Sequence, residues 1–145
     1  MNYNPLVSII CLCYNHEKFV PLALQSVIDQ TYPNIELIIV DDCSNDGSST
    51  AIKEWLRQHP EIVFIENTTN KGNTKSFNAA FAVSKGDYII DLAADDILNT
   101  NAVELQLEAF RTSIYDNLGI VYGNVELIFE DDTHFKYFFD FLCSW

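Results

Sequence analysis

Two apolar runs, each followed by a pair of aspartates, constrain the fold of this chain more than any other feature. Residues 35–40 precede Asp41 and Asp42, and residues 88–92 precede Asp95 and Asp96 after two alanines. Short, nearly continuous apolar runs are typical of strands that are buried on both faces. In an open α/β sheet, ligands bind outside the carboxyl ends of the strands. We therefore expect both acidic pairs to face one crevice.

The rest of the chain alternates strand and helix patterns at the spacing of βα units. Apolar runs predict further strands at 6–14 and 62–65, and two more at 120–122 and 125–129. Apolar residues at helical spacing predict helices at 19–30 and 100–113. They also predict a helix with an apolar stripe over 52–59 that is ended by Pro60, and one lined by Phe77, Ala80 and Phe81 that stops at Lys85 and Gly86. This alternation predicts a mostly parallel sheet covered on both faces by helices, which is a three-layer α/β/α architecture.

The charge balance limits the possible partners. Eight basic residues against 21 acidic residues give a formal net charge of −13. A field of this sign repels a nucleic-acid backbone, so we expect no nucleic-acid partner. It also repels a free diphosphate, so a diphosphate ligand would need a cation at its site. A hydrophobic content of 48% predicts a globular chain.

The cysteines and the termini bear on location. The four cysteines form no zinc-ligand pattern, and Cys11 and Cys13 read as two buried thiols in one strand, which favours a reducing compartment. The N-terminus lacks the basic segment of a signal peptide, and no apolar run approaches the roughly 20 residues that cross a bilayer. We expect a soluble, cytoplasmic protein. The aromatic segment 135–145 is interpreted as a core-covering helix or the start of a further region, with a peripheral membrane contact or a homo-oligomer contact as alternatives.

Four segments in this order resemble the family 2 glycosyltransferases. They are VSIICLCYN at 7–15, SVIDQTYP at 26–33 followed by VDDCSNDG at 40–47, NKGNTKSFN at 70–78, and the strand from Gly86 into Asp95 and Asp96. The resemblance implies a GT-A fold, which is Rossmann-like, in a single domain over 1–145. It also implies that this domain is the nucleotide-sugar-binding part of an enzyme and lacks the acceptor-binding half.

The resemblance also implies a set of residues around the donor nucleotide. The backbone of Leu12 and Cys13 can bind a base edge, Asp42 can accept from the imide N–H of uracil, and Gly72 lets its loop approach a ligand. The full expected set is Leu12, Cys13, Asn15, Asp42, Gly72, Lys75, Ala94 and Asp95. A structural alternative for Asp42 is to cap its own loop through Ser44 or Asn45. Asp46 is expected to cap the helix that begins near Ser48.

The second acidic pair resembles the metal-binding D-x-D-D motif of this family. Asp95 matches its metal-binding aspartate, Asp96 is expected to assist, and Ala93 stands where the first aspartate of the motif would be. With diphosphate oxygens and waters, these carboxylates would form a shell for Mn²⁺ or Mg²⁺. Phe77 occupies a position where many members of the family carry an arginine.

The predicted function is metal-assisted transfer of a sugar, with inversion, from a nucleotide-diphosphate sugar to a hydroxyl of a saccharide or lipid-linked acceptor. UDP is the favoured nucleotide, and cell-envelope polysaccharide synthesis at the cytoplasmic face of the membrane is the expected setting. The general base of such enzymes lies well downstream of the metal motif, so we expect it outside this chain. Glu126, Glu130, Asp131 and Asp132 read as turn carboxylates. The alternative is a non-catalytic nucleotide-sugar-binding or assembly module. Two other classes of α/β domain are less consistent with the sequence. The chain lacks the lysine that a receiver domain carries after its last strand, and it lacks the G-x-G-x-x-G that follows the first strand of a dinucleotide-binding domain.

Overall fold

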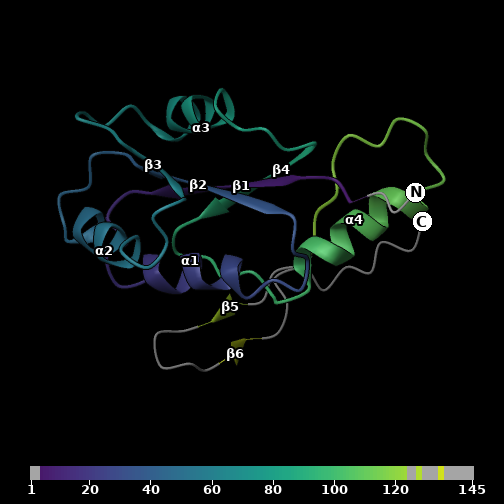
Figure 1. The fold of residues 1–145 in the computed structure, drawn as a ribbon, viewed down its shortest axis with the longest axis horizontal. Coiled ribbons are helices and arrows are strands. Elements are labelled where there is room, and N and C mark those ends of the chain that lie inside the picture. The colour runs from purple at the N-terminus through teal and green to yellow at the C-terminus, as the bar shows by residue number, and fades with distance from the viewer. Residues whose placement is uncertain (1–3, 124–126, 129–133, 136–145) are drawn as a thin grey trace. The chain divides into compact units, whose positions relative to one another are not determined.

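The computed structural model describes residues 4–123, 127–128 and 134–135. The chain divides into two compact units, Met1–Glu104 and Leu105–Trp145, which are considered separately (Figure 1). The first unit contains the sheet and both acidic pairs. The residues that line the cleft described below all belong to this unit.

The first unit is built on a four-stranded parallel sheet. Its strands are β1 (Val7–Cys13), β2 (Ile35–Asp41), β3 (Val63–Glu66) and β4 (Tyr88–Ala93), in the spatial order β3-β2-β1-β4. The predicted strands at 6–14, 35–40, 62–65 and 88–92 are confirmed to within two residues at each end. Cys13 pairs with Asp41 and Leu12 with Ala93, so β1, β2 and β4 all end at one edge.

Helices cover both faces of this sheet. Helix α3 (Asn73–Phe81) lies over one face, and α1 (Val20–Ile28) and α2 (Ser48–Trp55) lie over the other (Figure 1). Between α3 and the sheet, Ala80 of the helix and Ile10, Ile38 and Val40 of the strands form a cluster that is almost completely excluded from solvent. These three layers confirm the predicted α/β/α architecture.

Local sequence explains where the helices that border the site begin. Pro21 lies in the first turn of α1, where the missing N–H costs nothing. Gly72 precedes α3 with a φ of 82°, in the left-handed region that favours glycine. Cys11 and Cys13 are buried free thiols, as expected.

The second unit departs from prediction at one strand. Helix α4 (Ala102–Thr112) continues into it, but residues 118–123 form neither helix nor strand, so the strand predicted at 120–122 is wrong. Its residues favour β structure, but a strand forms only where another strand pairs with it. The strand predicted at 125–129 is represented by β5 (Leu127–Ile128), which pairs antiparallel with β6 (His134–Phe135). The acidic residues at 126 and 130–132, and the tail beyond 135, lie outside the described residues. Among the described helices, none has the length and apolar character needed to cross a membrane.

Candidate functional site

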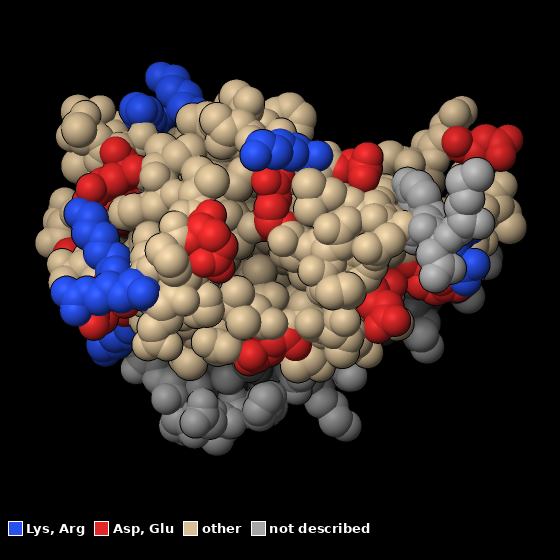
Figure 2. Space-filling model, viewed as in Figure 1, with Lys and Arg blue, Asp and Glu red and all other residues tan. Residues whose placement is uncertain are grey.

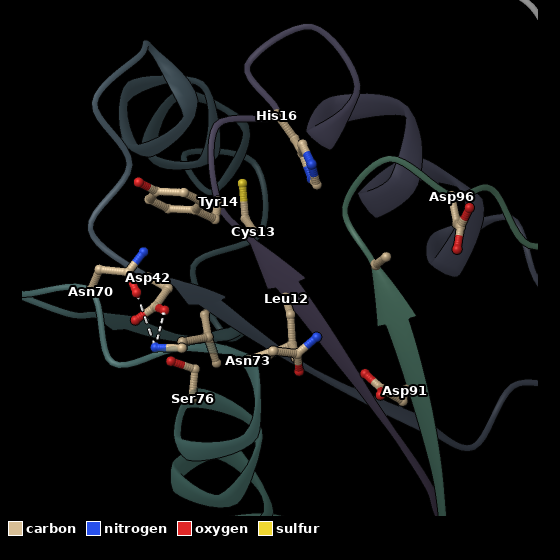
Figure 3. Close-up of a pocket in the computed structure, with 13 residues that line it drawn as sticks. Leu12, Cys13, Tyr14, His16, Asp42, Asn70, Asn73, Ser76, Asp91 and Asp96 are labelled. Atoms are coloured by element: carbon tan, nitrogen blue, oxygen red, sulfur yellow. Dashed lines mark hydrogen bonds between the residues drawn. The ribbon is translucent and has the colours of Figure 1, made fainter.

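A cleft of about 430 Å³ opens at the carboxyl edge of the sheet (Figure 3). Its floor is a row of paired residues, Val40, Leu12 and Ala93, from β2, β1 and β4. One side is formed by Asn70, Gly72, Asn73 and Ser76, and the other by His16 and Asp96. Both acidic pairs therefore reach this cleft through one member each, Asp42 and Asp96. This confirms that the two strand ends share one crevice.

Asp42 holds the loop that forms one side of the cleft. Its carboxylate accepts hydrogen bonds from the backbone N–H of Lys71 at 2.9 Å, the backbone N–H of Gly72 at 2.8 Å and Nδ2 of Asn67 at 2.9 Å. The side chain is only 6% exposed. Desolvation opposes its ionisation, but these three hydrogen bonds and the nearby Ser76 hydroxyl together lower the pKa of Asp42. The carboxylate is therefore a fixed anion that positions residues 70–72.

Asp41 and Asn15 organise the neighbouring loop. Asp41 accepts from the backbone N–H and the hydroxyl of Ser44, which is the capping role considered for Asp42. That alternative for Asp42 is therefore wrong, because its oxygens are turned toward residues 67–72. Asn15 has a φ of 61°, and its Oδ1 accepts from the backbone N–H of Asn45 at 2.8 Å. Its side chain thus holds the loop together.

Asp46, predicted to cap α2, lies just before the N-cap residue Gly47 and bonds the first residue of the helix. It accepts from the backbone N–H of Ser48 at 2.9 Å and from the backbone N–H of Glu17 at 3.0 Å. Desolvation opposes ionisation here too, but these bonds, with that from the Ser48 hydroxyl, lower the pKa of Asp46. Ser48 in turn accepts from the backbone N–H of His16 at 2.9 Å. This chain of bonds fixes the backbone from which His16 projects.

His16 faces the second acidic pair. Its Nδ1 lies 3.6 Å from Oδ1 of Asp95, is buried, and has no hydrogen-bond partner among the described residues. Asp96 lines the cleft, and its pKa is raised by desolvation and by the Asp95 carboxylate, with His16 acting in the opposite sense. Two carboxylates beside an imidazole whose nitrogen lacks a partner form an incomplete polar site.

The residues present fit a divalent cation that is held jointly with a ligand. Mg²⁺ and Mn²⁺ prefer carboxylate oxygens, which Asp95 and Asp96 would supply. The unpartnered Nδ1 of His16 is placed to donate to Asp95, as groups behind metal-bound carboxylates do. No group of three or more acidic, histidine or cysteine side chains in the described part of the chain could hold a metal ion. The remaining ligands would come from diphosphate and water.

The structure separates the predicted site residues into two groups. Leu12, Cys13, Asp42, Gly72 and Asp96 line the cleft. Asn15, Lys75, Ala94 and Asp95 do not: Lys75 is exposed on α3, and Ala94 is completely buried with its N–H bonded to the Leu12 carbonyl. The roles assigned to all of these residues remain predictions.

Eight further cleft residues were not among the site residues predicted from sequence: Tyr14, His16, Val40, Asn70, Asn73, Ser76, Asp91 and Ala93. Asp91 carried a usable signal, because it is the one charged residue in its strand and shares a face with Ala93, two positions later. Phe77, at the position of the expected arginine, packs against the core under α3 and stacks on Phe81 with ring centroids 6.3 Å apart. That position therefore serves packing rather than phosphate contact.

A parallel sheet with a cleft at its carboxyl edge is the ligand-binding form of an α/β domain. Comparison with known proteins makes the class specific: the model of glycosyl transferase family 2 matches residues 8–140. The chain belongs to this family, as the sequence segments indicated. The observed sheet and helices, with the structural neighbours below, confirm the GT-A fold.

Three known proteins illustrate the relationship. The UDP-Glc:alpha-D-GlcNAc-diphosphoundecaprenol beta-1,3-glucosyltransferase WfgD of Escherichia coli is 34% identical over 123 residues, covering 85% of this chain and 47% of WfgD. The mannosyltransferase PcManGT of Pyrobaculum calidifontis, solved with GDP-Man and Mn²⁺, matches with a TM-score of 0.68 and 24% identity over 78% of this chain and 34% of its own. TarS 1-349 of S. aureus, solved with UDP, matches with a TM-score of 0.65 and 26% identity over 73% of this chain and 32% of its own. The chain spans less than half the length of the curated relatives that it matches.

Proposed function

We propose that the cleft binds the nucleotide-diphosphate sugar of a glycosyltransferase, with UDP as the favoured nucleotide. The observation that carries this proposal is the arrangement of the two strand-end acidic pairs around one cleft. Asp42 holds a loop at one side, and Asp96 lies at the other. The relative WfgD, whose name specifies UDP-Glc, and TarS, solved with UDP, support the choice of nucleotide.

The base would lie at the Asp42 side. Oδ2 of Asp42 accepts one bond, from Gly72, so it retains capacity for the imide N–H of uracil. The carbonyl oxygens of Leu12 and Cys13 already accept from the N–H groups of Ala94 and Asp42, each at 2.9 Å. A base edge would therefore use the second lone pair of one of these carbonyls.

The diphosphate would lie at the opposite side, with Mn²⁺ or Mg²⁺ held by Asp95 and Asp96. Such a cation, when bound, neutralises the charge that develops on a leaving diphosphate. The chain needs this neutralisation because its net charge is −13, and Figure 2 shows acidic side chains dispersed among uncharged ones. PcManGT, which shares the fold, was solved with Mn²⁺. Lys75, exposed on α3, is a further proposed partner of the diphosphate.

The proposed reaction is transfer of the sugar with inversion to a hydroxyl of a saccharide or lipid-linked acceptor. Residues 1–145 would form the donor-binding part of the enzyme, with the acceptor half and the general base outside them. A lipid-linked acceptor is the one named for WfgD, and it would place the protein at the cytoplasmic face of a membrane in cell-envelope polysaccharide synthesis. The aromatic tail is a proposed contact with that membrane or with a second copy.

A non-catalytic nucleotide-sugar-binding module is a second candidate. It is favoured by Ala93, which removes one carboxylate of the metal motif from the floor of the cleft, and by Phe77, which removes the expected arginine. Transfer of radiolabelled sugar to an acceptor by the complete protein would select the enzyme. Donor binding without transfer to any acceptor, under conditions where a known family member is active, would select the module.

The experiment that tests donor binding is a calorimetric titration of UDP, GDP and CDP into the chain, first with Mn²⁺ and then with EDTA. We expect binding that requires Mn²⁺ and favours UDP. Binding of UDP that is equally tight in EDTA would overturn the metal assignment. Failure of all three nucleotides to bind would overturn the proposal as a whole.

A further inference from the structure

Asp91 is a carboxylate on the floor of the cleft to which neither sequence nor family resemblance gave a role. It lies in β4 opposite Ile10 of β1 and shares a face with Ala93, two residues later. Its side chain is exposed and points into the cleft (Figure 3). Because the side chain at position 93 is only a methyl group, nothing larger on β4 stands between Asp91 and the cleft.

The carboxylate of Asp91 has no partner within the protein. No hydrogen bond or ion pair reaches it from residues 4–123, 127–128 or 134–135, whereas Asp42 in the same cleft accepts three hydrogen bonds. Desolvation by the surrounding protein raises the pKa of Asp91. An acceptor that is partly withdrawn from water without a donor has a free-energy cost, which a ligand carrying O–H or N–H groups would offset.

The position of Asp91 indicates which hydrogen-bond donors of a bound nucleotide could reach its carboxylate. The cleft runs from the loop held by Asp42 to His16 and Asp96. In Figure 3, Leu12 lies between these two sides, and Asp91 lies beyond Leu12 on β4, two residues before Ala93 and on the Asp96 side. In a nucleoside diphosphate, the ribose stands between the base and the phosphates. Its vicinal 2′ and 3′ hydroxyls are the only strong hydrogen-bond donors in that part of the molecule. A carboxylate has two acceptor oxygens and can bind both hydroxyls.

We propose that Asp91 accepts hydrogen bonds from the ribose hydroxyls of the nucleoside diphosphate and thereby selects ribonucleotide donors. This inference rests on the proposed function, because it takes the base and the diphosphate at the ends assigned above. It gives the cleft a carboxylate devoted to ligand rather than to loop structure. It also explains why a strand that is otherwise apolar carries an unpartnered charge at this position.

The test compares UDP with 2′,3′-dideoxy-UDP in the presence of Mn²⁺, for the full chain and for Asp91→Ala and Asp91→Asn. Glu61→Gln is the matched control, because Glu61 is exposed on the loop before β3 and its loss changes net charge equally. We expect the unaltered chain to prefer UDP. Asp91→Ala should lose about 10- to 100-fold in affinity for UDP, the scale of hydrogen bonds to a charged group, and little for the dideoxy compound. Asp91→Asn should fall between them, and Glu61→Gln should bind both compounds normally.

Several results would overturn the inference. Unchanged UDP affinity in Asp91→Ala would do so. Equal losses of affinity for UDP and 2′,3′-dideoxy-UDP would also do so, because the lost affinity would then not depend on the ribose hydroxyls. A loss seen with UDP-GlcNAc but not with UDP would assign Asp91 to the sugar instead. A lowered melting temperature for Asp91→Asn would indicate a structural role, because no protein contact should be lost. Failure of the unaltered chain to bind UDP appears before any substitution and would overturn the proposed function together with this inference.

Discussion

Replacement of Asp42 tests whether this carboxylate builds the cleft. Asp42→Ala removes the acceptor of three hydrogen bonds, from Asn67, Lys71 and Gly72. Hydrogen bonds to charged groups contribute about 1.5–3 kcal/mol each, but two of these donors are backbone N–H groups of an exposed loop that can turn to water. Nδ2 of Asn67, which is 5% exposed, retains its bond to the Ser76 hydroxyl. We therefore expect the free energy of unfolding to fall by about 2–4 kcal/mol, well below the sum of the three bonds.

Two comparisons make the cause specific. Asp42→Asn keeps the size of the side chain and one acceptor oxygen, so it should lose roughly half as much stability, about 1–2 kcal/mol. The lowered pKa of Asp42 gives the pH dependence. Its contribution to stability is fully present above the unfolded-state pKa, near 3.9, and is lost as the pH falls through the lower folded-state pKa. The difference between the unaltered chain and Asp42→Ala should therefore shrink below about pH 4.

Urea denaturation at pH 7 and at pH 3 measures these differences, and amide hydrogen exchange locates them. The N–H groups of Lys71 and Gly72 should be protected in the unaltered chain and exchange rapidly in Asp42→Ala. Asp29→Ala, an exposed aspartate at the end of α1, is the control and should change neither result. A loss below about 0.5 kcal/mol, the range of ordinary surface substitutions, would refute the reasoning. A loss that is the same at both pH values would refute the electrostatic part.

Three further substitutions test the metal site and the sheet. Asp95→Ala should abolish Mn²⁺-dependent UDP binding in calorimetry with unfolding unchanged, since the side chain is 49% exposed; unaltered binding would disprove the metal assignment. His16→Ala should weaken Mn²⁺ binding about 10-fold, measured by the electron paramagnetic resonance of free Mn²⁺, because the group that orients Asp95 is lost; equal affinity would exclude that role. Gly86→Ala would place a Cβ 2.5 Å from the backbone nitrogen of Ser8 and should lower the free energy of unfolding by about 1–3 kcal/mol, as measured by urea denaturation. An unchanged free energy of unfolding would mean that the backbone between β1 and β4 can shift to make room for the methyl group.

The layered fold was predictable because its strands are nearly continuous apolar runs. Residues 35–40 are apolar except for Glu36, and they form all of β2 but its last residue, with four consecutive buried apolar residues at 37–40. A parallel sheet covered on both faces requires such runs, so pattern and structure agree. The rule that ligands bind at the carboxyl edge then placed Asp42 and Asp96 at one cleft without any coordinates. At 120–122 the same reasoning failed, because β propensity says nothing about whether a pairing strand is present.

The finer organisation of the cleft could not be predicted from sequence. Asp42 bonds to backbone N–H groups of Lys71 and Gly72, about 30 residues away, and a backbone donor leaves no trace in residue identity. The alternative role for Asp42, a cap through Ser44, involves a neighbour in sequence, but Asp41 makes that bond instead. Asp91 was not predicted, because a single charged residue in an apolar strand does not by itself indicate a ligand site. Only its alternation with Ala93, combined with the observed cleft, identifies it as a site residue.

The aspartates around the cleft divide according to where their hydrogen-bond donors come from. Asp41 and Asp42, at the end of β2, are 2% and 6% exposed, and the chain itself supplies their donors, so they shape the loops. Asp91 and Asp96 lie on and after β4, and no side-chain hydrogen bond reaches either of them from the described residues. Desolvation raises the pKa of both, so hydroxyl groups or a cation brought by a ligand would stabilise the carboxylates that the protein leaves uncompensated. The first acidic pair therefore builds the cleft, and the carboxylates of the β4 segment are the ones left for its ligand.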